Sequence, residues 1–141
     1  MISNSAEETF EFARHFAERL ERPAVILLSG DLGAGKTVFA KGIAAAMGID
    51  PREVTSPTFT LVNTHRVGGR TLHHVDLYRL NSVSSSDLGL EEMFDEPGAV
   101  TIVEWAERLA DAPSGSIRVK IDYLSDSQRG IDIERWSALS T

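Results

Sequence analysis

The fold is decided by a short glycine-rich stretch, Gly30-Asp31-Leu32-Gly33-Ala34-Gly35-Lys36-Thr37. It fills every fixed position of the phosphate-binding pattern G-x-x-x-x-G-K-[ST], the P-loop or Walker A motif, and holds a third glycine. Glycines let the backbone curl so that successive N–H groups point into one hollow, where phosphate oxygens bind. The pattern predicts that Lys36 reaches the β- and γ-phosphates of a nucleotide. It also predicts that the Thr37 hydroxyl binds the bridging Mg²⁺.

The residues on either side predict the strand and the helix that such a loop requires. Before the loop, residues 24–28 are a continuous apolar run, typical of a strand buried on both faces of a parallel sheet. After it, residues 36–47 carry apolar side chains at helical spacing, and Gly48 follows where a left-handed cap is favoured. A glycine-rich turn that binds nothing is the alternative. We favour an α/β P-loop fold of three layers, with a parallel central sheet.

Length, charge and composition narrow the class of protein. The 141 residues predict one domain, 1–141, with little room for a separate lid or substrate domain. The net charge is −7 with only three lysines, so the protein repels phosphate backbones and we expect no direct binding of nucleic acid. The absence of cysteine excludes disulfides and thiolate metal sites. With no signal peptide and no membrane-length apolar run, the sequence predicts a cytoplasmic protein.

The N-terminal segment predicts a helix that packs on the sheet. Ser5-Ala6-Glu7-Glu8 has the pattern of a capping box, and apolar residues then follow at helical spacing until a stop near Pro23. Thr9 lies on the apolar face of this helix. It can be a core residue, or it can lie near the base of the nucleotide.

Downstream of the P-loop helix, Ser56, Pro57 and Thr58 form a stiff loop rich in hydroxyl groups. Such a loop can be a simple turn. It can equally be a switch segment whose hydroxyls sense the γ-phosphate and Mg²⁺.

Two acidic residues are the candidates for metal and water chemistry. Gly68-Gly69 predicts a tight hairpin whose strands extend the sheet in antiparallel fashion. Asp76 lies within its second strand, where a buried carboxylate needs a metal, an arginine or hydroxyl donors nearby. Glu104 closes the apolar run 99–103, the place where a P-loop NTPase keeps its Mg²⁺-binding or water-orienting acid. An ordinary solvated strand end is the alternative for Glu104.

Other side chains carry weaker signals. His73 and His74 are neighbours on a strand and point to opposite faces, so they cannot chelate one ion together, and a hydrogen-bonding role is favoured for each. Residues 87–94 predict a short helix. Residues 117–123 and 131–136 alternate and predict a terminal antiparallel pair. The loop between them holds Arg129, which either stacks on an adenine or lies in solvent.

Chemistry alone leaves three classes of function open: an ATPase, a small-molecule kinase that uses the same P-loop, and a nucleotide-dependent binding module with negligible hydrolysis. The guanine-reading motif of GTPases is absent. Measuring phosphate release with and without partner proteins separates the three classes.

Four blocks in the chain together resemble one family, the small bacterial ATPase of the tRNA threonylcarbamoyladenosine pathway known as TsaE or YjeE. The resemblance covers nearly the whole chain, and the blocks are residues 30–37, 56–62, 74–80 and 104–105. Three departures from the usual pattern, Val38, Val75 and Ala106, remove no group that does chemistry.

This resemblance implies an ATPase that is weak alone and is stimulated by its partners TsaD and TsaB in the modification of tRNA. It implies that Ser56 to Thr58 form a switch loop. It further implies that Thr37, Asp76 and Glu104 surround the Mg²⁺ or the attacking water, and that Trp105 has a functional position. With Lys36, the two acids would form the catalytic set, and ATP is the implied substrate.

Overall fold

A computed structural model describes residues 1–30, 35–55, 61–78, 80, 82, 84 and 89–135. Its strands are β1 (Ile2–Ser3), β2 (Ala24–Gly30), β3 (Val62–Val67), β4 (Arg70–Asp76), β5 (Ala99–Glu104), β6 (Ile117–Tyr123) and β7 (Arg129–Arg135). Its helices are α1 (Ala6–Glu18), α2 (Lys36–Ala46) and α3 (Leu90–Phe94), with 3₁₀ turns η1 (Pro51–Glu53) and η3 (Ala106–Arg108).

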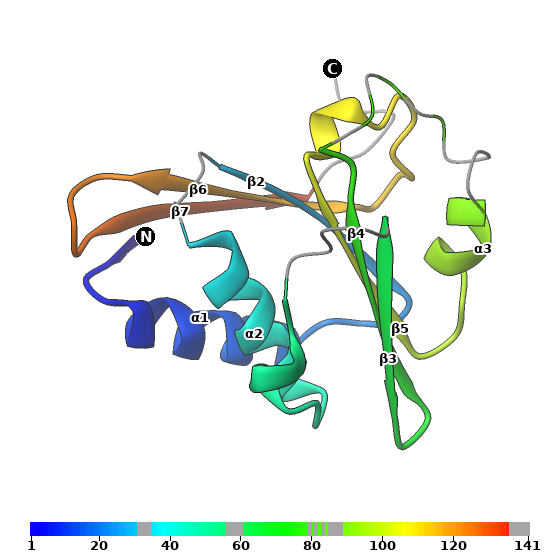
Figure 1. Ribbon diagram of the computed structural model, residues 1–141, viewed down its shortest axis with the longest axis horizontal. Helices are drawn as coiled ribbons and strands as arrows, with labels where there is room; N and C mark the ends of the chain where they lie inside the picture. The colour runs from blue at the N-terminus through cyan, green and yellow to red at the C-terminus, as the bar shows by residue number, and fades with distance from the viewer. Residues whose placement is uncertain are drawn as a thin grey trace.

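All these strands form one sheet in the order β1-β7-β6-β2-β5-β4-β3 (Figure 1). The four central strands, β6, β2, β5 and β4, run parallel. Antiparallel strands extend the sheet at both sides, with β3 beside β4 and β7 beside β6. The predicted α/β fold with a parallel centre and antiparallel extensions is confirmed.

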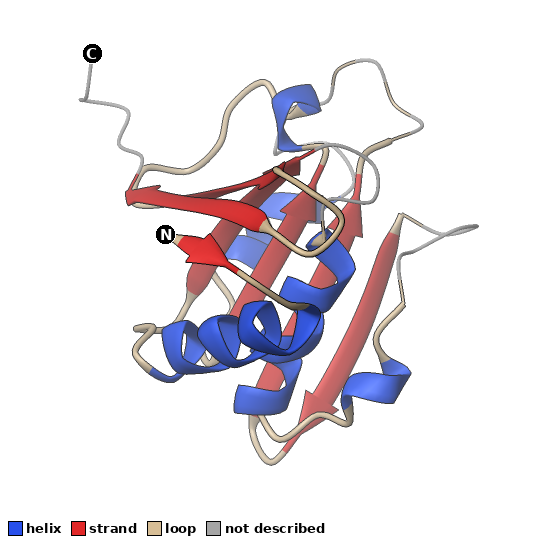
Figure 2. Ribbon diagram, turned by 90° about the vertical axis from the view of Figure 1, so that its left-hand side faces the viewer, coloured by secondary structure: helices blue, strands red, loops and turns tan. Residues whose placement is uncertain are grey.

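Helices cover both faces of the sheet and bury a separate apolar core on each. On one face α1 and α2 pack over Ile26, Leu28, Ile102 and Val119, and Figure 2 shows these helices in front of the strands. On the other face a smaller core includes residues of α3, and Figure 1 places this short helix across the sheet from α1 and α2. No helix in the described part of the chain is long and apolar enough to span a membrane.

Strand β2 and helix α2 form as the P-loop pattern predicts. Residues 24–28 are buried, because β2 has a parallel neighbour on each side and a helical layer over each face. Helix α2 begins at Lys36 and ends at Ala46, one residue earlier than predicted, and Gly48 follows two residues later with a left-handed φ of +80°. Only glycine adopts this conformation without strain, so the chain can turn away after the last helical residue.

Helix α1 differs from the predicted capping box in one detail. The Ser5 hydroxyl accepts the Glu8 N–H at 3.0 Å, as expected, but the Glu8 carboxylate accepts the N–H of Asn4 instead of Ser5. The helix ends at Glu18, earlier than the predicted stop near Pro23. Residues 19–23 are the turn that leads into β2.

The predicted hairpin and the predicted C-terminal antiparallel pair are both confirmed. Gly68 and Gly69 have φ of +56° and +78°, as a two-residue hairpin turn requires. Strands β6 and β7 pair antiparallel, and both have a further neighbour in the sheet, which the sequence did not predict. Strand β6 lies directly against β2 in parallel register, and the two residues of β1 pair with the outer side of β7. Strand alternation predicts that a strand exists, but it does not predict the partner.

The predicted helix over residues 87–94 corresponds to α3 in the described residues. Helix α3 begins at Leu90, after Gly89 with a φ of +71°, and ends at Phe94. Residues 85–88 lie outside the described residues. Leu90 and Phe94 are buried and anchor the smaller core.

The closest approach of α1 and α2 depends on Gly42. A Cβ atom there would lie 2.4 Å from the Phe10 carbonyl oxygen and 2.7 Å from the Ala13 Cβ. We expect Gly42→Ala to lower the free energy of unfolding by about 2 kcal/mol, because forced separation of packed helices exceeds the gain of about 1 kcal/mol in helix propensity. Urea unfolding measures this difference.

The control is Gly130→Ala in β7, where an added Cβ makes only ordinary contacts at 3.6–3.9 Å. Its stability should stay within about 0.5 kcal/mol of the parent. Equal stability of the two variants would contradict the close helix approach.

Candidate nucleotide-binding site

Three neighbouring parallel strands end together at one edge of the sheet and bring the candidate residues to it. β2 ends at Gly30, β5 at Glu104 and β4 at Asp76. Glu104 is in register with Leu28 on one side and with Asp76 on the other. The carboxyl ends of parallel strands are where α/β proteins bind ligands. The two acids and the start of the P-loop are therefore gathered at one edge, and Asp76 is the last residue of β4, not a residue in the middle of the strand as predicted.

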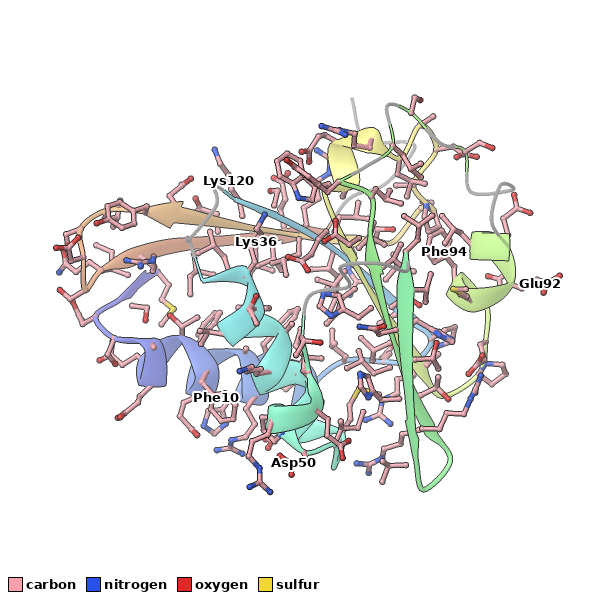
Figure 3. The ribbon with its side chains drawn as sticks, viewed as in Figure 1. Phe10, Lys36, Asp50, Glu92, Phe94 and Lys120 are labelled. Atoms are coloured by element: carbon pink, nitrogen blue, oxygen red, sulfur yellow. The ribbon has the colours of Figure 1, made fainter. Side chains whose placement is uncertain are left out.

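The described end of the P-loop consists of Gly35, Lys36 and Thr37 at the start of α2. Gly35 precedes α2 with a φ of +99°, a conformation that a residue with a Cβ would adopt only with strain. Lys36 lies in the first turn of α2 (Figure 3), where backbone N–H groups are free of helical partners and the helix dipole favours anions. Thr37 follows and is half-buried. Asp31, Leu32, Gly33 and Ala34 lie outside the described residues.

Asp76 is half-buried at the end of β4. Its Oδ1 accepts the N–H of Tyr78 at 2.9 Å. Burial raises the pKa of Asp76 above its ordinary value, and the nearby Glu104 adds to the rise, whereas the Tyr78 N–H, His74 and Lys36 act in the opposite direction. The expected arginine or hydroxyl donor is not among its described partners. A backbone N–H and the positive charge of Lys36 stabilise the carboxylate instead.

Glu104 is buried, with 4 % of its surface exposed, so the alternative of a solvated strand end is wrong. Its Oε2 lies 2.6 Å from Nε2 of His74, on the neighbouring strand β4. His74 is fully buried as well. Sequence reasoning missed this pair because the two residues are thirty positions apart, and only the strand register brings them together.

Trp105 and Lys36 are in contact. Trp105 follows β5 in a left-handed conformation, with φ of +58°, the only positive φ of a non-glycine residue in the described segments. Its ring lies 4.9 Å from the Lys36 Nζ and 5.0 Å from the Tyr78 ring. The Arg108 guanidinium lies 5.3 Å from the same ring and donates to the Tyr78 carbonyl oxygen. The indole is thus held against the P-loop lysine by an aromatic ring and a second cation.

His73 behaves as predicted and serves the structure. Its Nδ1 is 2.9 Å from the Thr64 hydroxyl and its Nε2 is 3.1 Å from Oε1 of Glu96. It points to the opposite face of β4 from His74. The two histidines therefore share no ligand, as expected.

Thr9 and Arg129 have partners within the protein. The Thr9 hydroxyl is buried and lies 2.7 Å from the Ser3 hydroxyl, which gives it a structural role in α1. The prediction that Arg129 lies in the loop is wrong, because Arg129 is the first residue of β7. Its guanidinium lies 4.6 Å from the ring of Tyr123. Contacts of either residue with the base stay predictions. Ser56, Pro57 and Thr58, the predicted switch loop, lie outside the described residues.

A hollow of about 450 Å³ lies between α1 and the β6–β7 hairpin. Phe12, Phe16, Leu20, Ile117 and Ile133 line it. Asp76, Glu104 and the described P-loop residues Gly35 and Lys36 are not among the residues that line it. We therefore place the nucleotide site by its chemistry, at the edge where β2, β5 and β4 end.

Replacing Asp76 with asparagine should raise the melting temperature of the nucleotide-free protein by a few degrees at neutral pH. A carboxyl whose pKa is raised on folding stabilises the folded state in its protonated form. This contribution is complete below the unfolded pKa of about 3.9 and is lost as the pH rises through the folded pKa. At neutral pH the charged group therefore opposes folding, whereas an amide still accepts the Tyr78 N–H. Thermal melts at neutral and acidic pH measure the difference.

Asp132→Asn, an exposed carboxylate on β7, is the matched control and should leave the melting temperature unchanged. The gain for Asp76→Asn should shrink in acid, where the parent group is protonated. A loss of stability at neutral pH would contradict this account.

The class of protein is a P-loop protein. It is defined by the glycine-rich sequence before α2, by the start of that helix, and by the two acids at the ends of neighbouring parallel strands. The family model described as "Threonylcarbamoyl adenosine biosynthesis protein TsaE" matches residues 3–131. The chain belongs to the TsaE family.

Individual relatives agree with this assignment over most of the chain. The curated TsaE protein of Treponema pallidum is 39 % identical over 134 residues, which cover 94 % of this chain and 97 % of that protein. The TsaE protein of Bacillus subtilis is 41 % identical over 126 residues, which cover 89 % of this chain and 78 % of that protein. The crystal structure of YdiB from Bacillus subtilis superposes with a TM-score of 0.75 at 34 % identity, covering 96 % of this chain and 83 % of that one.

Proposed function

We propose that this protein is an Mg²⁺-dependent subunit that binds and hydrolyses ATP in the threonylcarbamoyladenosine modification of tRNA, acting through TsaD and TsaB. One observation carries the proposal. Asp76 and Glu104 lie in register on neighbouring parallel strands, next to the strand that leads into a complete P-loop sequence. Membership of the TsaE family supports the pathway and, with it, a cytoplasmic location.

In this proposal the phosphates bind at the start of α2. The P-loop backbone and the helix N-terminus donate N–H groups to phosphate oxygens. Lys36 leaves the Trp105 ring and places its ammonium group against the β- and γ-phosphates, a contact between charges that is stronger than the cation–π contact it replaces.

The residues at the strand ends fit Mg²⁺. Oxygen atoms are the ligands that Mg²⁺ prefers, and they are offered here by Thr37, Asp76 and Glu104. The described residues include no cluster of three or more His, Cys, Asp or Glu side chains that would surround a metal ion by itself. This fits an ion that takes few protein ligands and shares its remaining positions with phosphates and water. When bound, Mg²⁺ neutralises charge on the β- and γ-phosphate oxygens.

Hydrolysis then needs one water molecule in line with the leaving group. The water oxygen forms a bond to the γ-phosphorus, and the bond from that phosphorus to the β–γ bridging oxygen breaks with its electron pair, giving ADP and phosphate. Glu104 orients this water and takes up the proton that it loses, which passes on to phosphate or solvent. Lys36 stabilises the charge that develops on the transferred group.

In this proposal the protein acts on tRNA modification indirectly, through other proteins that bind the tRNA. At a net charge of −7, with three lysines, the chain cannot neutralise several phosphates of a tRNA. TsaD and TsaB would then hold the tRNA. The proposed switch loop Ser56 to Thr58 and the surface near Trp105, where Tyr78 is 58 % exposed, would present the nucleotide state to them.

The proposal is tested by measuring phosphate release from ATP by the chain alone, by the TsaD and TsaB pair alone, and by all three together. We expect weak activity of the chain alone and clear stimulation in the full mixture, which depends on Mg²⁺. In filter binding at physiological salt, we expect no appreciable retention of labelled tRNA by the chain alone.

Three results would count against the proposal. Tight retention of tRNA without partners would assign the nucleic-acid contact to this chain. Transfer of the γ-phosphoryl group to an acceptor other than water would indicate a kinase. Nucleotide binding with no phosphate release in any mixture would indicate a binding module.

A further inference from the structure

His74 is a buried polar residue that the proposed chemistry does not yet use. It lies in β4, two residues before Asp76 and on the same face of the sheet, and its ring is fully buried. A buried imidazole costs free energy unless it is hydrogen-bonded. Its Nε2 lies 2.6 Å from Oε2 of Glu104, whereas its Nδ1 has no partner among the described residues.

The pairing determines which nitrogen carries the proton. In a neutral imidazole, a hydrogen bond to a carboxylate oxygen of Glu104 requires Nε2 to be the donor, which leaves the lone pair on Nδ1. One of the two Glu104 oxygens is thereby occupied on the side of β4. The other oxygen, Oε1, is left for the contents of the site.

We propose that His74 is a positioning residue for Glu104, which holds Oε2 so that Oε1 faces the attacking water. The inference rests on the proposed function of Glu104 as the water-orienting acid. A glutamate side chain that is free to rotate must lose rotamer freedom before it can hold a water molecule, and a displacement of about 1 Å lowers rates about a hundredfold. A hydrogen bond from the buried His74 ring to Oε2 fixes the position of the Glu104 carboxylate.

The local charges make such a donor necessary. Asp76 and Glu104 are directly in register on adjacent strands, where two like charges repel each other. Without a donor on the inner side, repulsion would turn the Glu104 carboxylate away from Asp76. An apolar residue at position 74 would fill the core and leave no orphan Nδ1, so packing alone does not explain a histidine there.

His73 offers a matched control on the same strand. It is also buried, at 3 % exposure, and it also has a glutamate partner, Glu96. It faces the other side of the sheet, away from Glu104. Replacing it disturbs an equally buried imidazole without touching the proposed water-orienting acid.

The experiment compares His74→Leu, His74→Gln and His73→Leu by single-turnover phosphate release at saturating Mg-ATP with TsaD and TsaB present. Calorimetric titration gives their nucleotide affinity. We expect His74→Leu to lower the rate about 10- to 100-fold, with affinity within about twofold of the parent. His74→Gln, whose amide can still donate to Oε2, should recover to within about threefold, and His73→Leu should keep the parent rate.

A double variant tests whether His74 acts through Glu104. In the Glu104→Gln background, His74→Leu should cause no further loss of rate. Should His74→Leu not fold, His74→Asn replaces it, because asparagine is polar but too short to reach Oε2. The proposal is overturned by a parent-like rate in His74→Leu, by an equal loss in His74→Gln, or by additive losses in the double variant.

A measurement without turnover separates this inference from the proposed function. Nitrogen-15 NMR of histidine-labelled protein should show the Nε2–H tautomer for His74, and its hydrogen-bonded proton signal should be lost in Glu104→Leu. The Nδ1–H tautomer in the parent would overturn the inference even if ATP is hydrolysed. Absence of phosphate release with the expected tautomer would instead overturn the proposed function, and with it the positioning role.

Discussion

Lys36→Ala should remove most of the thermal stabilisation that Mg-ATP gives to the parent protein. A ligand that binds only the folded state stabilises it by about 2.7 kcal/mol at a hundredfold excess over its dissociation constant. Each hydrogen bond of a charged group is worth about 1.5–3 kcal/mol, so loss of the ammonium group should weaken nucleotide binding at least about tenfold. Thermal melts over a nucleotide titration measure both the shift and the affinity.

Lys41→Ala is the matched control, because it removes the same charge from the same helix, away from the site. It should retain the full nucleotide-induced shift. An undiminished shift in Lys36→Ala would mean that nucleotide binds elsewhere. Both variants lose one positive charge. A difference between their nucleotide-induced shifts therefore reports the local contact of Lys36 and not the change in net charge.

Glu104→Gln should bind nucleotide like the parent and lose most of its hydrolysis. The amide keeps the shape of the side chain and can still accept from His74, but it cannot take up a proton from water. General-base catalysis contributes about 10²- to 10⁴-fold, so phosphate release in the presence of TsaD and TsaB should fall by a factor in that range.

Glu107→Gln controls for the loss of one negative charge, because Glu107 is an exposed acid in η3, three residues after Glu104. It should keep the parent rate of hydrolysis. Asp76→Ala should also keep nucleotide and lose turnover. The Asp76→Ala and Glu104→Gln losses should not add if both acids serve one cluster of metal and water. Parent-like hydrolysis in both single variants would contradict the assignment of the acids.

Features that depend on local pattern were predictable from the sequence. The apolar run before Gly30 and the helical spacing after Lys36 predicted β2 and α2, because burial on both faces and a single apolar face leave different periodicities. The two glycines at 68 and 69 predicted the hairpin turn. The position of Glu104 at a strand end followed from the length of its apolar run.

Features that depend on strand register or tertiary packing were not predictable. The pairing of His74 with Glu104 requires β4 and β5 to be adjacent parallel strands, and no local sequence pattern predicts that adjacency. Strand β1 has only two residues, too few to show a period. Arg129 was assigned to a loop because the boundary between turn and strand carries no sharp signal there.

The contact between the Trp105 ring and Lys36 has an optical consequence. The indole is a natural fluorophore, and Lys36 lies 4.9 Å from its ring. In the proposed mechanism this cation moves to the phosphates when nucleotide arrives, so the electric field at the indole changes with occupancy. Trp105 is one of two tryptophans in the sequence, and its ring is in contact with the P-loop lysine. The protein therefore carries a built-in reporter whose emission should follow the filling of its own site, without any attached dye.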